Sequence, residues 1–344
     1  MVDIIAALRA ALYDFSETSV RRELAAVMAD DAVIHLCHPF GDLVGPDALY
    51  DTAFAPLFSA IPDLERRDLI VTAGQTKAGD SWIGTCGFYT GVFLAPFMDI
   101  PPSGHQIGMR YHEFFRIRDN AIVEMQAIWD LPSLMMQARA WPMAPSLGRE
   151  WLVPGPAMQN GLSPVPADIT NSETSLSIVL DMLTHLSQHP SQGGPEVMKA
   201  EQFWHPRMSW YGPAGIGTAR GIAGFRHWHQ IPFLKAMPDR CGGTIKTADT
   251  HFFAEGDFVA VTGWPNMEMT VTGDGWLGIA PTGHKITMRS LDFWRVEKGL
   301  IRENWVLVDL LDVYHQIGVD VFARLREFNK SRVMGSITYA DELT

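Results

Sequence analysis

The chain of 344 residues is 47% hydrophobic and 19% charged, which is typical of a soluble globular protein. A single hydrophobic core stops growing at about 250–300 residues, so this length favours two domains. The formal net charge of −12 and the absence of a Lys/Arg-rich run disfavour nucleic acid as a partner. Three cysteines are too few for a disulfide framework, and neither a signal peptide nor a membrane-spanning run is recognised. We expect a cytoplasmic protein.

The first part of the chain predicts helices followed by strands. Amphipathic patterns indicate helices over 4–13, 20–29 and 46–58, with a short β-rich run at 32–36 between them. Strand-like composition follows over 68–73, 81–93, 105–117 and 121–130. Asp119–Asn120 stands at a plausible hairpin turn between the last two strands.

A proline-rich segment follows at 139–171, and its composition predicts a semi-rigid, extended linker. Its apolar residues Trp141, Trp151 and Leu152 suggest that part of it packs on a domain. Its prolines are Pro142, Pro145, Pro154, Pro156, Pro164 and Pro166.

The second part repeats the order of the first. We expect a helix over 175–187, a strand at 208–211, a helix over 222–236 and then strands, with Lys298–Gly299 at a hairpin turn. Helices followed by an antiparallel sheet predict an α+β layout in which the helices cover one face of a curved sheet. The expected boundaries are 1–138 for copy one, 139–171 for the linker, 172–325 for copy two and 326–344 for a tail.

The two copies are related by sequence. When 101–137 is laid over 280–316 without a gap, about 13 of 37 positions are identical, including Gly104 with Gly283 and Asp130 with Asp309. Upstream, Pro62–Asp63 matches Pro238–Asp239 at a slightly different offset. A repeat of this length indicates tandem duplication of a whole domain.

The repeated segment resembles the SnoaL-like polyketide cyclase family, which belongs to the NTF2-like cone-shaped α+β fold. The resemblance rests on the Pro-Ser/Thr-Gly turn, the Phe-x-Arg strand, the Ile-x-Glu strand and the closing aspartate with a downstream glutamine. It implies a deep apolar cavity and an aldol condensation without cofactor or metal. It also implies that the closing aspartates, Asp130 and Asp309, are general acid/base residues, with a helping histidine fourteen residues before each.

That histidine is replaced in both copies, by Arg116 and Arg295. Arginine stays protonated, so it would stabilise negative charge or anchor a carboxylate rather than exchange a proton. Each arginine also stands eight residues before a glutamate, Glu124 or Glu303. An odd-numbered loop would make each Arg–Glu pair an ordinary cross-strand ion pair, whereas a two-residue turn would put the partners on opposite faces.

The closing aspartates allow two roles. Each follows an apolar run that would raise its pKa, as a general base requires, and each also stands where a helix N-cap is expected. Arg110 and Arg289 have the same strand parity as Arg116 and Arg295 and would approach the aspartates in the first register. Such Asp–Arg pairs resemble those of the limonene epoxide hydrolases and keep hydrolysis as an alternative.

Copy two is the richer in aromatic residues, which suits a hydrophobic ligand or simple core filling. The main hypothesis is a cofactor-independent enzyme that acts on a hydrophobic carbonyl compound, and the competing one is a non-catalytic carrier. We expect no metal, since no His-x-x-x-His pair or carboxylate-supported cluster occurs. We expect the copies to pair within one chain as a pseudo-dimer, with homodimerisation also open. The candidate substrate-binding residues are Trp305, Trp294, Trp210, Trp228, Arg289, Arg110, Tyr13 and Trp82.

Overall fold

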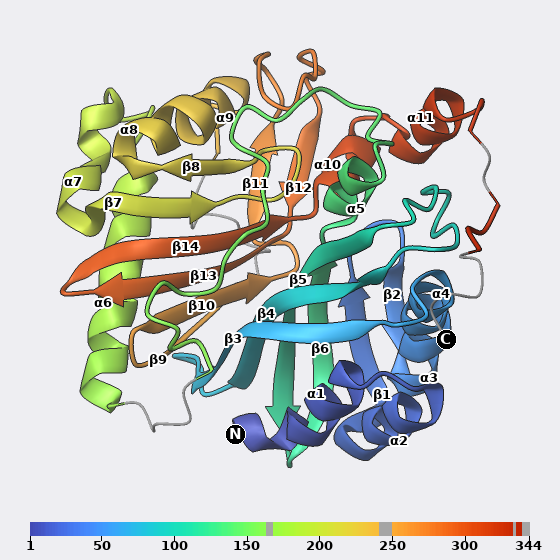
Figure 1. The fold of residues 1–344 in the computed structure, drawn as a ribbon. Helices are drawn as coiled ribbons and strands as arrows, with labels where there is room; N and C mark the ends of the chain where they lie inside the picture. The colour runs from blue at the N-terminus through green and yellow to red at the C-terminus, as the bar shows by residue number, and fades with distance from the viewer. Residues whose placement is uncertain (163–167, 241–249, 333–334, 339–344) are drawn as a thin grey trace.

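The computed structural model describes residues 1–162, 168–240, 250–332 and 335–338 (Figure 1). Two successive α+β units make up this part of the chain. Unit one runs from η1 to α5 and unit two from α6 to α11. Cys241, Pro164 and Pro166 lie outside the described residues.

Unit one begins with helices and ends with a sheet, as its sequence pattern predicts. Apart from the short last helix α5, its helices precede strands β3 to β6. Ser16 caps α2 by accepting a hydrogen bond from the Ser19 backbone N–H. The elements are η1 (Val2–Ile5), α1 (Ala6–Tyr13), α2 (Glu17–Val27), β1 (Met28–Leu36), β2 (Gly41–Val44), α3 (Gly45–Leu49), η2 (Tyr50–Phe54), α4 (Ala55–Ala60), β3 (Glu65–Gln75), β4 (Ser81–Val92), β5 (Gln106–Arg118), β6 (Ala121–Trp129) and α5 (Leu131–Gln137).

Unit two repeats this order, with a longer first helix and an additional small sheet formed by β11 and β12. Its elements are α6 (Ile169–Leu186), η3 (Pro195–Met198), α7 (Ala200–Phe203), β7 (Trp204–Tyr211), β8 (Thr218–Arg220), α8 (Gly221–Phe225), η4 (Arg226–Gln230), α9 (Ile231–Ala236), β9 (Thr250–Glu255), β10 (Phe258–Gly263), β11 (Met267–Thr270), β12 (Lys285–Met288), β13 (Ser290–Glu297), β14 (Leu300–Val308), α10 (Leu310–Gln316) and α11 (Val321–Phe328).

Each unit is built on a six-stranded sheet with the same topology. The strand orders are β2-β1-β6-β5-β4-β3 and β8-β7-β14-β13-β10-β9. The pairings are antiparallel except for β1 with β6 and β7 with β14, which are parallel, so one pairing per sheet departs from the expected antiparallel arrangement. The sheet of unit one curves, and β1 and β6 run across the direction of β3 (Figure 1).

The β5–β6 and β13–β14 hairpins explain the register of the Arg–Glu pairs. Both have two-residue turns with positive φ, Asp119–Asn120 and Lys298–Gly299, as type I′ turns require. Such a turn alone would put each arginine and its glutamate on opposite faces. A β-bulge directly after the arginine shifts the register by one residue, and Arg116 pairs with Glu124 and Arg295 with Glu303.

The outer faces of the two sheets pack against each other. The rings of Phe114 on β5 and Phe293 on β13 stack at 5.0 Å, and Thr262 Oγ1 donates a hydrogen bond of 2.6 Å to Gln126 Oε1. His112, fully buried here, lies 2.6 Å from the Leu291 carbonyl through its Nδ1 atom, and burial lowers its pKa well below the usual value. At these residues the two sheets therefore meet through stacked aromatics and neutral hydrogen bonds.

The linker crosses both units, as its apolar residues suggested in part. Trp141 packs edge-on against Tyr314, the Val71 N–H donates to the Gly161 carbonyl, and Trp305 Nε1 donates to the Pro154 carbonyl at 2.9 Å. Trp151 and Leu152, by contrast, are 56% and 70% exposed. Part of the linker thus packs on the units, as predicted, but of the three apolar residues on which that prediction rested only Trp141 belongs to the packed part.

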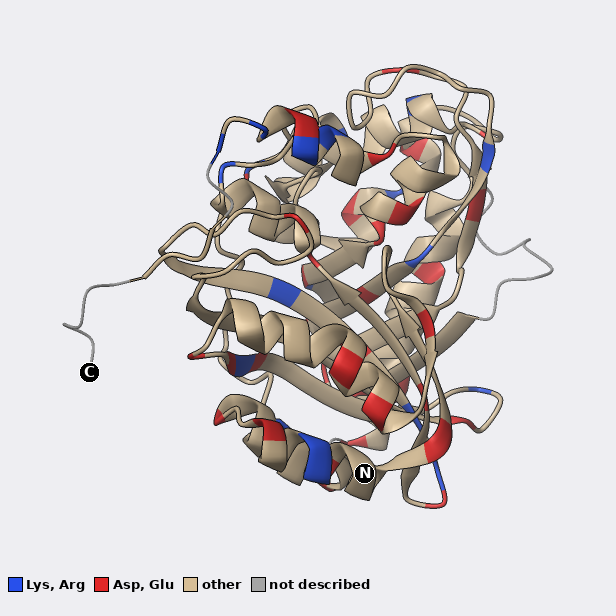
Figure 2. Cartoon of the chain, turned by 90° about the vertical axis from the view of Figure 1, so that its right-hand side faces the viewer, with Lys and Arg blue, Asp and Glu red and all other residues tan. Residues whose placement is uncertain are grey.

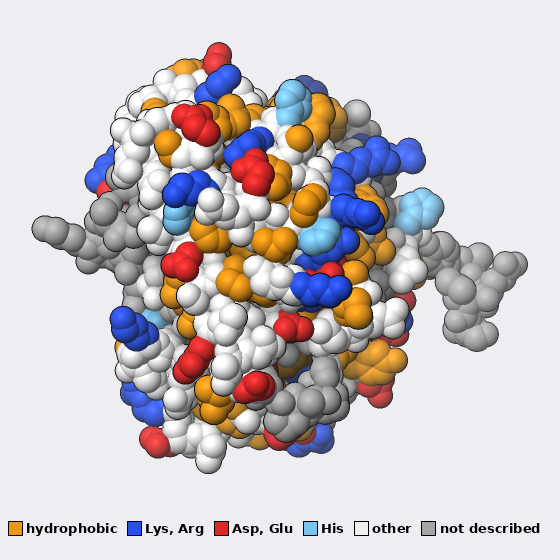
Figure 3. All heavy atoms as spheres, turned by 90° about the vertical axis from the view of Figure 1, so that its left-hand side faces the viewer, with side chains coloured by type: hydrophobic (Ala, Val, Ile, Leu, Met, Phe, Trp, Pro, Cys, Tyr) orange, Lys and Arg blue, Asp and Glu red, His pale blue; other side chains and the backbone are white. Residues whose placement is uncertain are grey.

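Charged residues of both signs are spread over the helices and strands of the molecule rather than sorted to one side (Figure 2). On the unit-two side, hydrophobic side chains are scattered among charged ones (Figure 3). Among the helices that the structure describes, none is long and apolar enough to cross a bilayer.

Gly84 on β4 tests the contact between the units. A Cβ there would lie 3.0 Å from ring atoms of both Phe114 and Phe293 and 3.2 Å from Phe253. We expect Gly84→Val to lower the free energy of unfolding by about 1–3 kcal/mol, because the added side chain would push the packed phenylalanine rings out of their present positions. Chemical denaturation measures the change.

Gly224 in α8 is the matched control, since its added Cβ would meet nothing within 4 Å. Gly224→Val should change the free energy of unfolding by no more than about 0.5 kcal/mol. Equal losses for the two variants would contradict the tight contact at Gly84.

Candidate functional site

A cavity of about 130 Å³ lies inside unit two, between its helices and the inner face of its sheet. Its wall is mostly apolar and aromatic, which is typical of small-molecule sites. The residues that line it are Met182, Leu183, Leu186, Trp204, Trp210, Ile216, Phe225, His229, Gln230, Phe233, Arg240, Met267, Trp276, Met288, Ser290, Asp292, Trp294, Asn304, Val306 and Val308.

Asp292, on β13, is the acidic residue in this wall. Its inward direction follows from strand alternation, since Ser290 and Trp294 share its face and also line the cavity. Ser290 Oγ donates a hydrogen bond of 2.6 Å to Asp292 Oδ1. Burial, only partly opposed by Ser290 and the positive charge of Arg240, raises the pKa of Asp292 to about 7. At neutral pH both protonation states of this carboxyl are populated, as proton transfer requires.

Four buried polar atoms of the same wall have no hydrogen-bond partner among the residues that the structure describes: Trp276 Nε1, Trp294 Nε1, Gln230 Oε1 and His229 Nδ1. Buried polar groups in folded proteins are nearly always paired, and an unpaired one costs about 1–3 kcal/mol. His229 is neutral, because burial lowers its pKa to about 3, and its ring stacks on Trp210 at 4.0 Å. Two donors and two further polar atoms thus belong to the side chains that line this apolar cavity, which suits a hydrophobic ligand with a few polar groups.

Unit one has a carboxylate at the strand position equivalent to Asp292, but there an arginine forms an ion pair with it. In the repeat, Glu113 on β5 corresponds to Asp292. The Glu113 carboxylate pairs with the buried Arg66 guanidinium and also accepts hydrogen bonds from Tyr89 Oη at 2.8 Å and Trp129 Nε1 at 3.0 Å. Arg66 in turn pairs with Asp68 at 2.9 Å. These side chains fill the inside of unit one with a satisfied polar network.

The closing aspartates lie on the outer face, at the junction of the two units. Asp309 caps α10, accepts the backbone N–H of His38 from unit one at 2.9 Å and pairs with Arg289 at 3.1 Å. Burial, and next the nearby Asp312 carboxylate, raise the pKa of Asp309 to about 6. Asp309 and Arg289 do not line the unit-two cavity.

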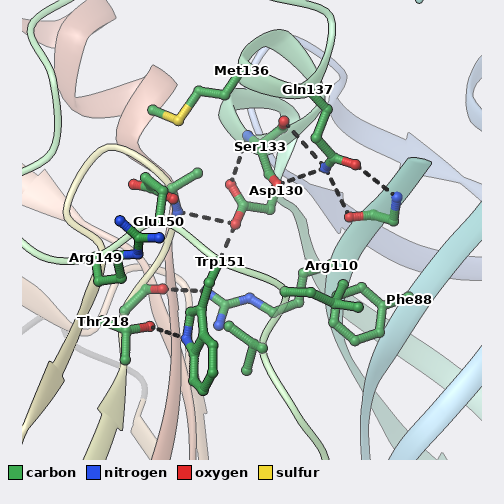
Figure 4. Close-up of a pocket in the computed structure, with 15 residues that line it drawn as sticks. Phe88, Arg110, Asp130, Ser133, Met136, Gln137, Arg149, Glu150, Trp151 and Thr218 are labelled. Carbon is green, nitrogen blue, oxygen red and sulfur yellow. Dashed lines mark hydrogen bonds and ion pairs between the residues drawn. The ribbon is translucent and has the colours of Figure 1, made fainter. Parts of the chain in front are cut away.

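Asp130 has the same arrangement in unit one. It caps α5, accepts the backbone N–H of Ala214 from unit two at 3.1 Å, and lies 3.7 Å from Arg110. Burial raises its pKa above the usual value. Asp130 and Arg110 line a second cavity, of about 320 Å³, between the two units and the linker (Figure 4). We call this the linker cavity.

Arg116 and Arg295 form ion pairs outside both cavities. Arg116 pairs with Asp80 at 2.8 Å and with Glu124 at 3.2 Å, and Arg295 pairs with Glu303 at 2.6 Å and Glu297 at 2.8 Å. Since the guanidinium groups are held by these carboxylates, neither arginine is placed to act on a ligand in either cavity.

The expected aromatic residues divide into two groups. Trp210 and Trp294 line the unit-two cavity. The others lie elsewhere. Trp305 is fully buried under the linker, and Trp82 is fully buried against His251 of unit two. Trp228 is 44% exposed, and Tyr13 is 57% exposed in a surface pocket that Arg9 and Asp68 also line. Trp305 points to the same side of the sheet as Asp309, as expected, but this side is the outer face and not the face that lines the cavity.

Sequence reasoning missed Asp292. The signal was present in the repeat itself, where Glu113 and Asp292 occupy equivalent positions and are both acidic. A comparison restricted to identical residues passes over this pair. The burial of each carboxyl, and the absence of an ion-pair partner for Asp292 among the described residues, depend on the packed structure.

Within the described ranges, no group of three or more His, Cys, Asp or Glu side chains is placed to hold a metal ion.

Comparison with solved structures finds many single-unit proteins. IdmH from Streptomyces antibioticus is 24% identical over 39% of this chain and 95% of its own, with a TM-score of 0.33. A SnoaL-like polyketide cyclase from Agrobacterium tumefaciens strain C58 is 21% identical over 39% and 94%, with a TM-score of 0.31. An NTF2-like protein from Burkholderia xenovorans LB400 is 16% identical over 43% and 98%, with a TM-score of 0.33. No curated protein matches the chain.

The family assignment rests on a match that covers most of the chain. The model of the SnoaL-like polyketide cyclase family matches residues 6–138 and again residues 194–317. The first segment contains the six-stranded sheet of unit one, and the second contains the six-stranded sheet of unit two. The chain therefore belongs to the SnoaL-like polyketide cyclase family, as a tandem duplication of its domain.

Proposed function

We propose that unit two is a cofactor-independent catalytic unit that binds a hydrophobic carbonyl compound and transfers protons through Asp292. The observation that carries this proposal is the buried Asp292 carboxyl, with a pKa of about 7, in an aromatic cavity where four polar atoms find no partner among the described side chains and backbone. Proton transfer by a positioned side chain is most effective when its pKa lies near the working pH.

The proposed reaction begins when the Asp292 carboxylate removes a proton from the carbon next to a carbonyl group, which gives an enolate and a protonated Asp292. The indole N–H groups of Trp276 and Trp294 supply hydrogen bonds for the developing oxyanion, since neither has a partner in the described ranges. In a cyclase reaction the enolate carbon then attacks a second carbonyl of the same molecule. Asp292 returns its proton to the resulting alkoxide, which restores the carboxylate.

The cavity limits the size of the substrate. At about 130 Å³ it is close to the volume of an engineered cavity, about 150 Å³, that binds benzene. Met182, Met267 and Met288 line it, and methionine side chains adapt easily to different shapes. A compact ring therefore fits as the cavity stands, and a larger polyketide requires the methionines to move.

Unit one has a different proposed role. Its Arg66–Glu113 network fills the equivalent space, so we assign it to supporting unit two rather than to catalysis. The contact between the units would then serve as the dimer interface of an intrachain pseudo-dimer. A carrier that binds the ligand without reacting is the competing function, and the following experiment separates the two.

Asp292→Asn tests the role of the carboxyl. The probe is acetophenone in deuterium oxide, and NMR follows the exchange of its methyl protons, which requires removal of a proton next to the carbonyl. We expect the wild-type chain to accelerate exchange and Asp292→Asn to slow it by about 100-fold or more, because the amide cannot accept the proton.

Asp320→Asn is the control, since Asp320 caps α11 outside the cavity and asparagine still caps a helix. Its exchange rate should stay within about threefold of wild type. Acetophenone binding without accelerated exchange by the wild-type chain would favour a carrier. An equal loss in both variants would remove Asp292 from its proposed role.

The pH dependence of exchange provides a second test. Because the carboxylate is the active form, the rate should rise with pH and reach half its maximum near pH 7. The Ser290 hydrogen bond lowers the pKa of Asp292, so Ser290→Ala should move this midpoint to higher pH. The backbone of Ser290 stays held by two hydrogen bonds to Asn266, which favours a local effect.

Stability should show the opposite trend with pH. The folded pKa of Asp292 is raised above its unfolded value, so the folded state binds the proton more tightly and loses stability as pH rises from about 4 to about 7. Asp292→Asn should weaken this loss, and denaturation at pH 5 and pH 8 measures it. Two results together would contradict the proposed ionisation: a midpoint of the exchange rate that Ser290→Ala leaves unchanged, and a loss of stability between pH 5 and pH 8 that is the same in Asp292→Asn as in the wild-type chain.

A further inference from the structure

The linker cavity is larger than the unit-two cavity and has a different chemistry. It measures about 320 Å³ and is walled by Phe88 and Arg110 of unit one, by Gly212, Ala214 and Thr218 of unit two, and by the linker from Arg149 to Val153 (Figure 4). Because three parts of the chain build it, a molecule bound there would contact both units and the linker.

Arg110 gives this cavity a polar anchor. The residue is 3% exposed, and its terminal nitrogens donate to the carbonyl groups of Tyr211, Gly212 and Val306 at 2.7–3.2 Å. Its Nε–H group is buried and has no partner within the described part of the chain. These carbonyls come from unit two, so three hydrogen bonds hold the guanidinium rigidly while its Nε–H donor stays unused. An oxygen acceptor on a ligand would satisfy it.

Trp151 gives the cavity an aromatic surface. Its indole Nε1 donates to Thr218 Oγ1 at 3.2 Å, which fixes the ring at the cavity wall while 56% of the residue stays exposed (Figure 4). The next residue, Leu152, also lines the cavity and is 70% exposed. Two large apolar side chains held out of the core at one cavity provide a surface on which a flat ring system can pack.

The charges at the cavity balance, which bears on the charge of a ligand. Two arginines, Arg110 and Arg149, stand against two carboxyls, Asp130 and Glu150. Asp130 accepts the backbone N–H groups of Ser133 and Ala214, and Glu150 accepts the Gly215 N–H and the Ser146 hydroxyl. An additional carboxylate would meet both of these acidic groups, so an uncharged acceptor is favoured.

The pseudo-equivalent position in the other unit is filled by side chains. There Arg289, the counterpart of Arg110, lies 4.5 Å below the ring of Trp264 and pairs with Asp309 and Asp312. The His38 and His315 rings stack beside them at 4.7 Å. The linker cavity is thus a property of one side of the duplicated pair and is not required by the repeat.

We propose that the linker cavity is a second ligand site, separate from the unit-two cavity, for a flat two-ring aromatic molecule with an uncharged oxygen acceptor. The rings pack on Trp151 and Leu152, and the acceptor oxygen receives the hydrogen bond of Arg110 Nε–H. Such a ligand would hold the two units and the linker together.

Calorimetric titration of the full chain tests this site with three matched probes: 2-acetylnaphthalene, 2-ethylnaphthalene and 2-naphthoate. We expect 2-acetylnaphthalene to bind about tenfold more tightly than 2-ethylnaphthalene, which lacks the acceptor, and more tightly than 2-naphthoate, which adds a negative charge. Equal affinity for the first two probes would overturn the role of Arg110, and tighter binding of 2-naphthoate would overturn the uncharged acceptor.

Trp151→Ala locates the site. We expect it to weaken binding of 2-acetylnaphthalene at least tenfold, whereas Trp228→Ala, which removes another exposed tryptophan from unit two, should leave the affinity unchanged. Thermal unfolding checks that both variants fold, as expected for exposed side chains. Full binding in Trp151→Ala, or an equal loss in both variants, would overturn the proposal.

Discussion

The reciprocal contact of the two closing aspartates is the constraint on which the molecule depends. Each buried carboxylate caps the helix of its own unit and accepts a backbone N–H from the other unit, Asp130 from Ala214 and Asp309 from His38. Ala214 stands at the position in unit two that His38 holds in unit one. A buried carboxylate is tolerated only when it is hydrogen-bonded, so neither aspartate is fully satisfied unless both units are in place. The duplicated residue thus fixes the arrangement of the pair.

This fixed arrangement separates the two faces of each sheet by role. Outer-face residues such as His112, Phe114 and Phe293 hold the units together, while inner-face residues decide whether a unit contains a cavity. Because alternation along a strand assigns neighbours to opposite faces, the inner face could diverge without disturbing the contact. Glu113 and Asp292 show the result: the first carboxylate is saturated by Arg66, Tyr89 and Trp129, whereas the second has, among the described residues, only the Ser290 hydroxyl as a hydrogen-bond partner.

Most of the fold was predictable because local sequence patterns indicate its helices and strands, and the same patterns occur in both copies. Amphipathic periodicity located the helices and strand composition the long strands, and the repeat supported both. The parallel pairing of β1 with β6 was not predictable, since it joins segments far apart in sequence. The site was less accessible for a similar reason. Strand parity correctly grouped Trp305 with Asp309, but parity alone does not say which face points inward, and the β-bulge after Arg116 depends on pairing geometry.

The linker shows why two units in one chain differ from two identical chains. A symmetric pair would present the same junction on both sides, whereas here a single segment crosses one side and leaves the other to side chains. On the linker side, Trp151 and Leu152 stand exposed over Arg110; on the other, Trp264 covers Arg289 directly. The connection therefore does more than raise the effective concentration of one unit near the other. It breaks the symmetry of the outer face, as the Glu113–Asp292 difference breaks that of the inner face, so the duplicated domain carries two unlike cavities on one shared framework.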